Sequence, residues 1–154
     1  MPAMQSGERV IRAYRESDLP ECAALYCKAF SAPPWNEHWT TQIAEQRISE
    51  LMCSPLSVGF LSEADGELLG MLIGSHVTYL YGRELLIHEL CVLPDRQRGG
   101  VGSALLQYVT ERLREESYAG IFLNTTHGYP SERFYLKNGF ERQQRTVALY
   151  RSLK

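Results

Sequence analysis

The sequence predicts an α/β domain (α+β in some schemes) built on one mixed, mostly antiparallel, twisted sheet flanked by about four helices. Asp65-Gly66 separates two β-rich runs and is a strong signal for a two-residue hairpin turn. Apolar residues recur at helical spacing in several other segments. The stretch Leu86–Leu113 indicates a strand, a glycine-rich turn and a helix, and the apolar run after it predicts a parallel strand.

The amino-terminal part predicts one strand and two helices. Glu8–Tyr14 is typical of a short edge strand. Ser17 and Asp18 are expected to cap a helix that has Pro20 in its first turn. This helix ends before Pro33-Pro34. Thr40 or Thr41 is expected to cap a second helix, whose apolar face carries Ile43, Ala44, Ile48, Leu51 and Met52.

The central part predicts a meander of strands. Val58–Ala64 leads into the Asp65-Gly66 turn, and the return strand begins near Glu67. The chain stays extended to Tyr81, and Gly82-Arg83 is interpreted as a second hairpin turn. A strand over Leu85–Leu93 then ends at Pro94.

The carboxy-terminal part is expected to alternate again between helix and strand. A helix follows the glycine-rich turn, and Ile121–Thr125 predicts a buried strand parallel to Leu85–Leu93. A short helix starts at Pro130 and ends at Gly139. Phe140–Leu149 is predicted to return as a final strand.

Length and charge narrow the class of protein. The 154 residues are most simply one domain, 1–154. A formal charge of −2 gives no electrostatic reason to expect nucleic acid or an anionic membrane as a partner. No run approaches the roughly 18 apolar residues of a membrane span, and the amino terminus lacks the apolar core of a signal peptide. A cytoplasmic protein is therefore expected.

The four cysteines, Cys22, Cys27, Cys53 and Cys91, contain no C-x-x-C pair, so no metal site is predicted. All are interpreted as reduced thiols. Cys91 lies in the strand before the glycine-rich turn, where a catalytic thiol is conceivable, but a small buried hydrophobe is the preferred interpretation.

The glycine-rich turn predicts an anion site. Gly100 and Gly102 permit positive φ and close approach of a ligand to the backbone. The following helix presents unpaired N–H groups and the positive end of its dipole to the same turn, and Arg96 and Arg98 add charge. No Gly-Lys-Ser/Thr follows, so the turn is not a P-loop. The alternative is an ordinary strand-to-helix turn in which glycine only relieves strain.

Two motifs resemble signatures of the GNAT superfamily of N-acetyltransferases. PDRQRGGVGSALL is similar to the family's acetyl-CoA pyrophosphate loop, Gln/Arg-x-x-Gly-x-Gly/Ala, with Gln97, Gly100 and Gly102 in the matching positions. SERFYLKNGFE resembles the family's Phe-Tyr-x-Lys-x-Gly-Phe segment. The order Arg98-Gly99 departs from the family, in which glycine more often comes first. The resemblance implies a GNAT fold with a splayed parallel strand pair, and allows for a homodimer.

The resemblance also implies where the co-substrate acetyl-CoA binds. The pantetheine arm would lie in the gap between the parallel strands, and a backbone N–H of Cys91 or Val92 would donate to the oxyanion. Asn124 matches a position that touches the coenzyme. The loop residues implied in coenzyme binding are Gln97, Arg98, Gly99, Gly100, Val101, Gly102 and Ser103.

Acyl transfer to an amine also needs a base and benefits from an acid. The resemblance implies that Glu89, in the strand before the loop, accepts the amine proton directly or through water, and that Tyr135 protonates the leaving thiolate. Alternatively, Glu89 pairs with an arginine or is an exposed strand residue, and Tyr135 is a core tyrosine. Strand alternation predicts His88 on the opposite face of the sheet from Glu89, and His127 is a weaker base candidate.

The segment APPWNEHWT predicts a wall of the acceptor site. Trp35 and Trp39 offer aromatic faces, and Glu37 could receive a cationic amine. The alternative is that both tryptophans only cover the core between two helices. The expected function is acetyl transfer from acetyl-CoA to a small amine resembling an aminoglycoside, polyamine or amino acid. A protein amino terminus or lysine, or a non-catalytic acyl-CoA sensor, are the alternatives.

Overall fold

The computed structural model describes residues 7–154. The chain divides into two compact units, and the boundary in the sequence falls between Asn124 and Thr125. The first unit contains a five-stranded sheet in the order of the chain. Its neighbouring strands are antiparallel except for the last two, which are parallel, so the predicted mixed sheet is confirmed. The strands are β1 (Val10–Ala13), β2 (Ser57–Ala64), β3 (Glu67–Tyr79), β4 (Gly82–Val92) and β5 (Gly120–Leu123).

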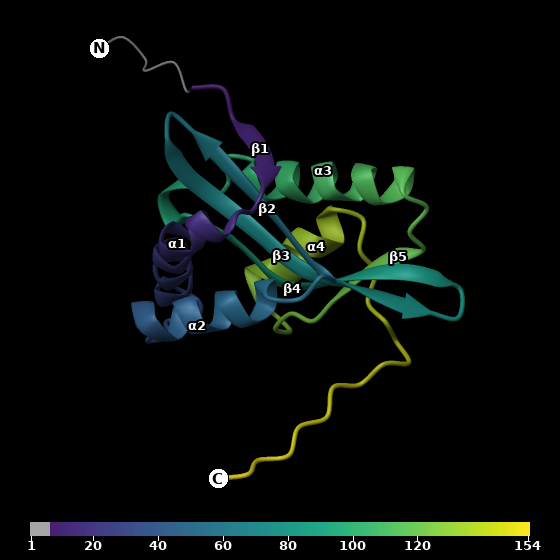
Figure 1. Cartoon of the computed structure of the whole chain (residues 1–154). Helices are drawn as coiled ribbons and strands as arrows, with labels where there is room; N and C mark the ends of the chain where they lie inside the picture. The colour runs from purple at the N-terminus through teal and green to yellow at the C-terminus, as the bar shows by residue number, and fades with distance from the viewer. Residues whose placement is uncertain (1–6) are drawn as a thin grey trace. The chain divides into compact units, whose positions relative to one another are not determined.

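Three helices cover the two faces of this sheet (Figure 1). Helices α1 (Leu19–Ser31) and α2 (Thr41–Met52) pack on one face, from which Tyr26 reaches Glu89. Helix α3 (Val101–Glu115) lies against the other face, where a Cβ on Gly70 would meet Val101. Among the residues that the structure describes, no helix is long and apolar enough to cross a membrane.

The helix caps follow the sequence in one case and depart from it in another. Thr40 caps α2, and its hydroxyl accepts a hydrogen bond from the Ile43 amide at 3.2 Å, as predicted. Asp18 precedes α1 but makes no side-chain cap to it. Its carboxylate accepts instead from the Arg15 amide at 2.7 Å and pairs with Arg12 at 2.8 Å, because a bidentate guanidinium competes with the cap.

The two hairpin turns also differ in outcome. Asp65 and Gly66 have φ of 52° and 75° and join β2 to β3, which confirms the first turn. The second turn is Leu80-Tyr81 and not Gly82-Arg83, because the β3–β4 register pairs Tyr79 with Gly82. Cross-strand pairing therefore decides this turn, and the local glycine does not.

Strand β4 is irregular in two ways. Its register against β3 shifts so that Ile73 pairs with Glu89 and Gly74 with Ile87, which leaves His88 as the extra residue of a β-bulge. On its other side β4 pairs with β5 only over Glu84–Ile87. The last five residues of β4 therefore run beyond β5, and this confirms the splayed parallel pair.

The second unit contains helix α4 (Pro130–Lys137) and the carboxy-terminal tail. Gly139 has φ of 90°, and the amides of Gly139 and Phe140 donate to the carbonyls of Leu136 and Tyr135, as in a Schellman motif. The prediction of a strand over Phe140–Leu149 is wrong: the tail has no regular structure. Strand propensity without a partner does not form a ladder.

Gly70 brings α3 close to the sheet beneath the glycine-rich loop. A Cβ there would lie 3.0 Å from Val101 Cγ1, 3.2 Å from the Cys91 carbonyl oxygen and 3.2 Å from Leu105 Cδ1. Val101 and Leu105 are both buried. Close packing at this position therefore fixes the height of the first turn of α3 above β3.

We expect Gly70→Ala to lower the free energy of unfolding by about 1–3 kcal/mol, since the added methyl group overpacks this contact. Denaturant unfolding measures the change. Gly120→Ala is the matched control, because the nearest atom to its added Cβ would be Glu84 Oε1 at 3.8 Å. Equal losses in the two variants would contradict the packing role of Gly70.

Candidate active site

The loop between β4 and α3 forms an open helix amino terminus. Pro94–Arg96 makes a single 3-10 turn, and Gly100, with φ of 82°, precedes the first residue of α3. No side chain caps this helix, so the amides of Val101, Gly102 and Ser103 have no intrahelical partner. This arrangement suits an anion, which gains from the amides and from the helix dipole.

The side chains around the loop are arranged differently from the sequence prediction. Gln97 Nε2 donates to the Val92 carbonyl at 3.3 Å and so fastens the loop to the end of β4. Arg96 pairs with Glu67 at 3.0 Å, which directs its charge toward β3. Arg98 has a positive φ of 65°. Arg9, which sequence reasoning missed, donates to the Gly99 carbonyl at 2.8 Å and brings an additional cation to the loop.

The open edge of β4 presents alternate backbone groups. The Leu93 amide donates to the Leu69 carbonyl in β3 at 2.9 Å, and the amide of Cys91, two residues earlier, points the same way. The amides of Leu90 and Val92 therefore face the side where β5 has ended. Strand geometry thus favours Val92 over Cys91 as an oxyanion donor.

Glu89 lies on the α1–α2 face of the sheet and is 8% exposed, which rules out the interpretation as an exposed strand residue. Arg47 of α2 contacts its Oε1 at 2.6 Å through Nη2 and at 2.7 Å through Nε. The Tyr26 hydroxyl donates to the same oxygen at 3.1 Å. The alternative that Glu89 pairs with an arginine is therefore what the structure shows.

The surroundings of Glu89 act on its pKa in opposite directions. Burial raises the pKa of the carboxyl group above its ordinary value, and the negative charge of Glu37 adds to this effect. The charge and hydrogen bonds of Arg47 and the hydrogen bond from Tyr26 oppose it. The net pKa is raised, so Glu89 is a better proton acceptor than a surface glutamate.

The bulge places His88 on the same face as Glu89, so the prediction from strand alternation is wrong. His88 Nε2 hydrogen-bonds the Ser75 hydroxyl, and Ser75 lies two residues from Ile73, the partner of Glu89. Burial lowers the pKa of His88, as does the positive charge of Arg47. His88 is therefore a neutral imidazole near neutral pH and a second group able to accept a proton on this face.

An aromatic cluster links the α1–α2 segment to Glu89. The ring centroids of Trp39 and Tyr26 are 4.7 Å apart, those of Tyr26 and Phe30 4.6 Å, and those of Phe30 and Trp35 5.5 Å. Trp39 also packs against the core. The structure is therefore compatible with both predicted roles of the tryptophans. Through their contacts with Tyr26 and Phe30, the two tryptophan rings belong to a cluster that reaches the sheet face carrying Glu89.

The cysteine nearest to this face is unsuited to nucleophilic chemistry. Cys91 is 6% exposed, and burial raises the pKa of its thiol well above the ordinary value. Burial likewise raises the pKa of Cys22 to about 12. Both thiols are protonated at neutral pH, which supports the interpretation of Cys91 as a small buried hydrophobe.

The two remaining candidates lie at and beyond the end of β5. Asn124 directly follows β5 and is exposed. Tyr135 lies in α4, partly buried, with ring centroids 5.1 Å from Phe134 and 5.4 Å from Phe140. His127, in the same unit as Tyr135, contacts Glu132 at 3.1 Å and is an exposed loop residue, as expected.

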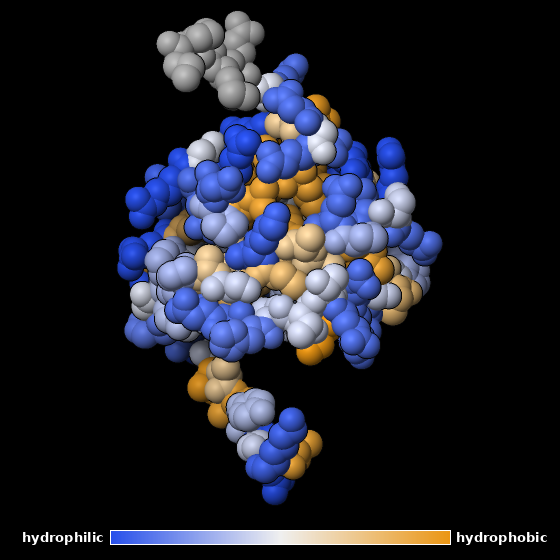
Figure 2. Space-filling view, turned by 90° about the vertical axis from the view of Figure 1, so that its left-hand side faces the viewer, coloured by the Kyte–Doolittle hydropathy of each residue, from blue (hydrophilic) through white to orange (hydrophobic). Residues whose placement is uncertain are grey.

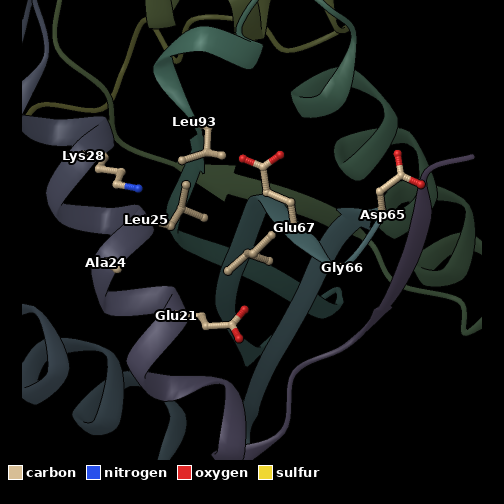
Figure 3. A pocket seen from close by; sticks show the side chains of 9 residues that line it. Glu21, Ala24, Leu25, Lys28, Asp65, Gly66, Glu67 and Leu93 are labelled. Carbon is tan, nitrogen blue, oxygen red and sulfur yellow. The ribbon is translucent and has the colours of Figure 1, made fainter. Parts of the chain in front are cut away.

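A cavity of about 330 Å³ lies between α1 and the β2–β3 turn and borders Leu93, where the loop after β4 begins (Figure 3). The side chains of Glu21, Lys28 and Glu67 point toward it, and Leu25 and Leu93 lie between them. None of the predicted site residues lines it. We therefore assign the candidate site on the chemistry around Glu89 and the glycine-rich loop, and not on the size of this cavity.

Besides Arg9, sequence reasoning missed three residues of the candidate site: Tyr26, Arg47 and Ser75. Tyr26 is one of the apolar residues that recur at helical spacing in α1, which indicates only a core position, and Ser75 carries no motif. Arg47 gave a usable signal, because it is the only basic residue of α2 and adjoins the buried Ile48. A cation next to the apolar face of a helix indicates a buried anionic partner.

The sequence profile described as "Acetyltransferase (GNAT) family" matches residues 19–140. The chain belongs to the GNAT acetyltransferase family. This confirms the family predicted from PDRQRGGVGSALL and FYLKNGF. The matched segment contains Glu89, the glycine-rich loop and Tyr135.

Individual relatives agree with this family. Mycothiol acetyltransferase of Clavibacter sepedonicus is 29% identical over 108 residues, which cover 70% of this chain and 34% of that protein. The chain thus spans about a third of the length of this curated relative.

Solved structures share the fold at low identity. A possible acetyltransferase from Clostridium difficile 630 has a TM-score of 0.81 at 13% identity, covering 95% of this chain and 99% of that one. AAC(6')-Iy, in complex with the bisubstrate analogue CoA-S-monomethyl-acetylneamine, has a TM-score of 0.72 at 20% identity, covering 94% and 98%. These similarities confirm the predicted GNAT fold.

We expect Arg47→Met to destabilise the protein by about 1–3 kcal/mol, because the buried Glu89 loses its counter-ion while Arg47 itself is 41% exposed. The loss should depend on pH. Without Arg47 the folded pKa of Glu89 rises further above its unfolded value of about 4.3. Folding then favours the protonated form, so stability is retained at acidic pH and falls as pH rises toward the folded pKa.

Thermal unfolding between acidic and mildly alkaline pH measures this effect. Gln42→Met is the matched control, since Gln42 is an exposed residue of the same helix. A loss of stability in Arg47→Met that does not grow with pH would contradict the pairing with Glu89.

Proposed function

We propose that the chain, as one domain over residues 1–154, transfers an acetyl group from acetyl-CoA to a small cationic amine by direct attack in a ternary complex. The observation that carries the proposal is the combination of a buried carboxylate of raised pKa, Glu89, with an uncapped helix amino terminus at the end of the same strand. The first would take the amine proton, and the second would hold the coenzyme phosphates.

The loop fits a diphosphate. The uncapped amides of Val101, Gly102 and Ser103 and the left-handed Gly100 offer a backbone cradle, and a Cβ on Gly100 would come within 3.7 Å of the Arg9 guanidinium. Arg98 and the Gly99 backbone complete the turn. Gln97 holds the loop to the end of β4 through its hydrogen bond to the Val92 carbonyl. When bound there, acetyl-CoA supplies the activated acyl group.

The open edge of β4 would position the thioester. The amide of Val92 points to the side that β5 leaves open and could donate to the acetyl oxygen as negative charge develops on it. Cys91 would contribute only backbone and packing. Asn124, at the end of β5, would contact the pantetheine arm from the other side of the gap.

Glu89 would act as the base. All hydrogen bonds to it from the described residues end on Oε1, which Arg47 and Tyr26 hold in place. Its second oxygen can then accept the amine proton, directly or through a water molecule. His88, neutral and bonded to Ser75, is the alternative base on this face. Tyr135 would protonate the leaving thiolate, a role we propose from the match to FYLKNGF.

The acceptor would bind among Trp35, Glu37 and Trp39. An ammonium group gains from aromatic faces and from an acidic partner. Glu37 lies close enough to raise the pKa of Glu89, so the two carboxylates act on the same region. The relatives named above include a mycothiol acetyltransferase and AAC(6')-Iy, which binds the bisubstrate analogue CoA-S-monomethyl-acetylneamine. This supports a small-molecule acceptor over a protein amino terminus or lysine.

The assay that tests this function is thiol release from acetyl-CoA over a panel of aminoglycosides, polyamines and amino acid derivatives. We expect at least one amine to accelerate release. Tight coenzyme binding without acceleration by any amine would favour a non-catalytic acyl-CoA sensor and overturn the proposal.

We expect Glu89→Gln to flatten the acidic limb of the pH–rate profile and to lower kcat by about 10²–10⁴-fold, the usual contribution of a general base. The wild-type limb should rise through a pKa above that of an ordinary glutamate, because burial raises it. His88→Gln is the control and should keep the limb. If the limb is unchanged in Glu89→Gln and lost in His88→Gln, the histidine is the base.

We expect Gly102→Val to weaken acetyl-CoA binding at least about 100-fold, because a branched side chain in the first turn of α3 fills the space that a diphosphate needs. Isothermal titration with the coenzyme measures this. Gln107→Val, at an exposed position of the same helix, controls for the lower helix propensity of valine. Normal affinity in Gly102→Val would remove the loop from the coenzyme site.

A further inference from the structure

Arg9 reaches the glycine-rich loop from the β1 edge of the sheet. It directly precedes β1, the first strand in the order of the sheet, whereas the gap for the pantetheine arm lies beside β5, the last. Its Nη1 donates to the Gly99 carbonyl at 2.8 Å. A Cβ on Gly100 would lie 3.7 Å from its Nη2. The guanidinium group is therefore bonded to the loop and lies beside the residue that precedes α3.

The register of β1 directs the Arg9 side chain to the face of the sheet that carries α3. Ile11 pairs with Ser62, and Ser62 pairs with Gly70. Gly70 faces α3, since an added Cβ there would meet Val101. Arg9 lies two residues before Ile11, so an extended chain directs both side chains to this face. The contact with the loop is thus a consequence of strand pairing.

Contacts on both sides of Arg9 hold its backbone in place, next to the β2–β3 turn (Figure 1). Before it, the Gly7 backbone lies directly on the Asp65 side chain, so that an added Cβ at Gly7 would clash with the carboxylate. After it, Val10 pairs with Glu63 near the end of β2. Part of the entropy cost of placing Arg9 over the loop is therefore incurred on folding, before a ligand binds.

The charge of Arg9 has no carboxylate partner among the described residues, and residues 1–6 contain no acidic side chain. Two nearby arginines differ from it: Arg12 pairs with two carboxylates, and Arg96 pairs with Glu67. Arg9 is exposed, and Figure 2 shows a mostly hydrophilic surface where the described chain begins, at the top of the view. A guanidinium group whose bonded partner is a neutral carbonyl can still bind an anion.

The coenzyme offers two separate groups of negative charge. Coenzyme A carries a diphosphate and, on the 3′ oxygen of its ribose, a further phosphate. Under the proposed function the uncapped amides of Val101, Gly102 and Ser103 hold the diphosphate. These amides are neutral donors at the end of one helix, so the ribose phosphate needs a separate cation. Arg9 supplies one beside the same loop, and its planar fork matches the oxygens of a phosphate.

We propose that Arg9 binds the ribose 3′-phosphate of the coenzyme and makes the site selective for coenzyme A over 3′-dephospho-coenzyme A. This assignment rests on the proposed function, because it concerns the coenzyme held by the same loop. Nη1 keeps its bond to the Gly99 carbonyl, and Nη2 and Nε are offered to the phosphate. Arg9 lies outside residues 19–140, so the family profile does not account for this contact.

Isothermal titration with coenzyme A and with 3′-dephospho-coenzyme A tests this role without acetyl transfer. The wild type should bind coenzyme A about tenfold more tightly than the dephospho form, as expected for one charged hydrogen-bonded pair. In Arg9→Gln this ratio should fall to about one, because only the affinity for coenzyme A is lost. Arg9→Lys, which keeps the charge without the fork, should retain part of the ratio. Arg114→Gln, exposed at the far end of α3, is the control and should keep it.

Three results would overturn the role of Arg9 while the proposed function stands. The first is a wild type that binds the two coenzyme forms equally well. The second is an unchanged ratio in Arg9→Gln. The third is an equal loss of affinity for both forms in that variant, which would mean that Arg9 only shapes the loop or contacts the diphosphate. A wild type that binds neither form would overturn the proposed function as well. Thermal unfolding checks that each variant is folded.

Discussion

The unequal pairing of β4 with its two neighbours is the constraint on which the candidate site depends. Against β3 the strand is paired from Gly82 to Val92, but against β5 only from Glu84 to Ile87. Antiparallel pairing on one side keeps the strand in place while the other side stays open. The backbone of Leu90 and Val92 is thereby available to a ligand without the cost of breaking a ladder.

The bulge at His88 falls at the point where β5 ends and has a second effect. Two titratable side chains, His88 and Glu89, are brought to one face of the sheet. Their charge states are set by different neighbours: Arg47 and Tyr26 act on Glu89, while burial and Arg47 keep the imidazole neutral. The register shift between β3 and β4 therefore produces both the bulge and the placement of His88 and Glu89 on one face of the sheet.

Features that follow from local rules could be predicted from the sequence. The Asp65-Gly66 turn, the Thr40 cap, the left-handed glycine before α3 and the glycine that ends α4 each depend on a few consecutive residues. The parallel β5 followed from the handedness of strand–helix–strand units. The two motifs predicted the family, which the sequence profile confirms.

Features that depend on distant partners could not be predicted. The bulge, the Leu80-Tyr81 turn and the Arg47–Glu89 pair are consequences of register and packing between segments that lie apart in the sequence. The carboxy-terminal tail was mispredicted for the same reason. Residues 146–150 have the composition of a strand, but a strand forms only where a second strand pairs with it.

The Arg47–Glu89 pair affects how many positive charges on the proposed acceptor the candidate site can balance. Glu37 and Arg47 both act on Glu89, and the formal charges of these two acidic side chains and one basic side chain sum to a single negative one. One singly charged ammonium group on the acceptor would balance this single negative charge. An acceptor that arrives with two or three positive charges needs further carboxylates, and these must come from its other contacts with the protein.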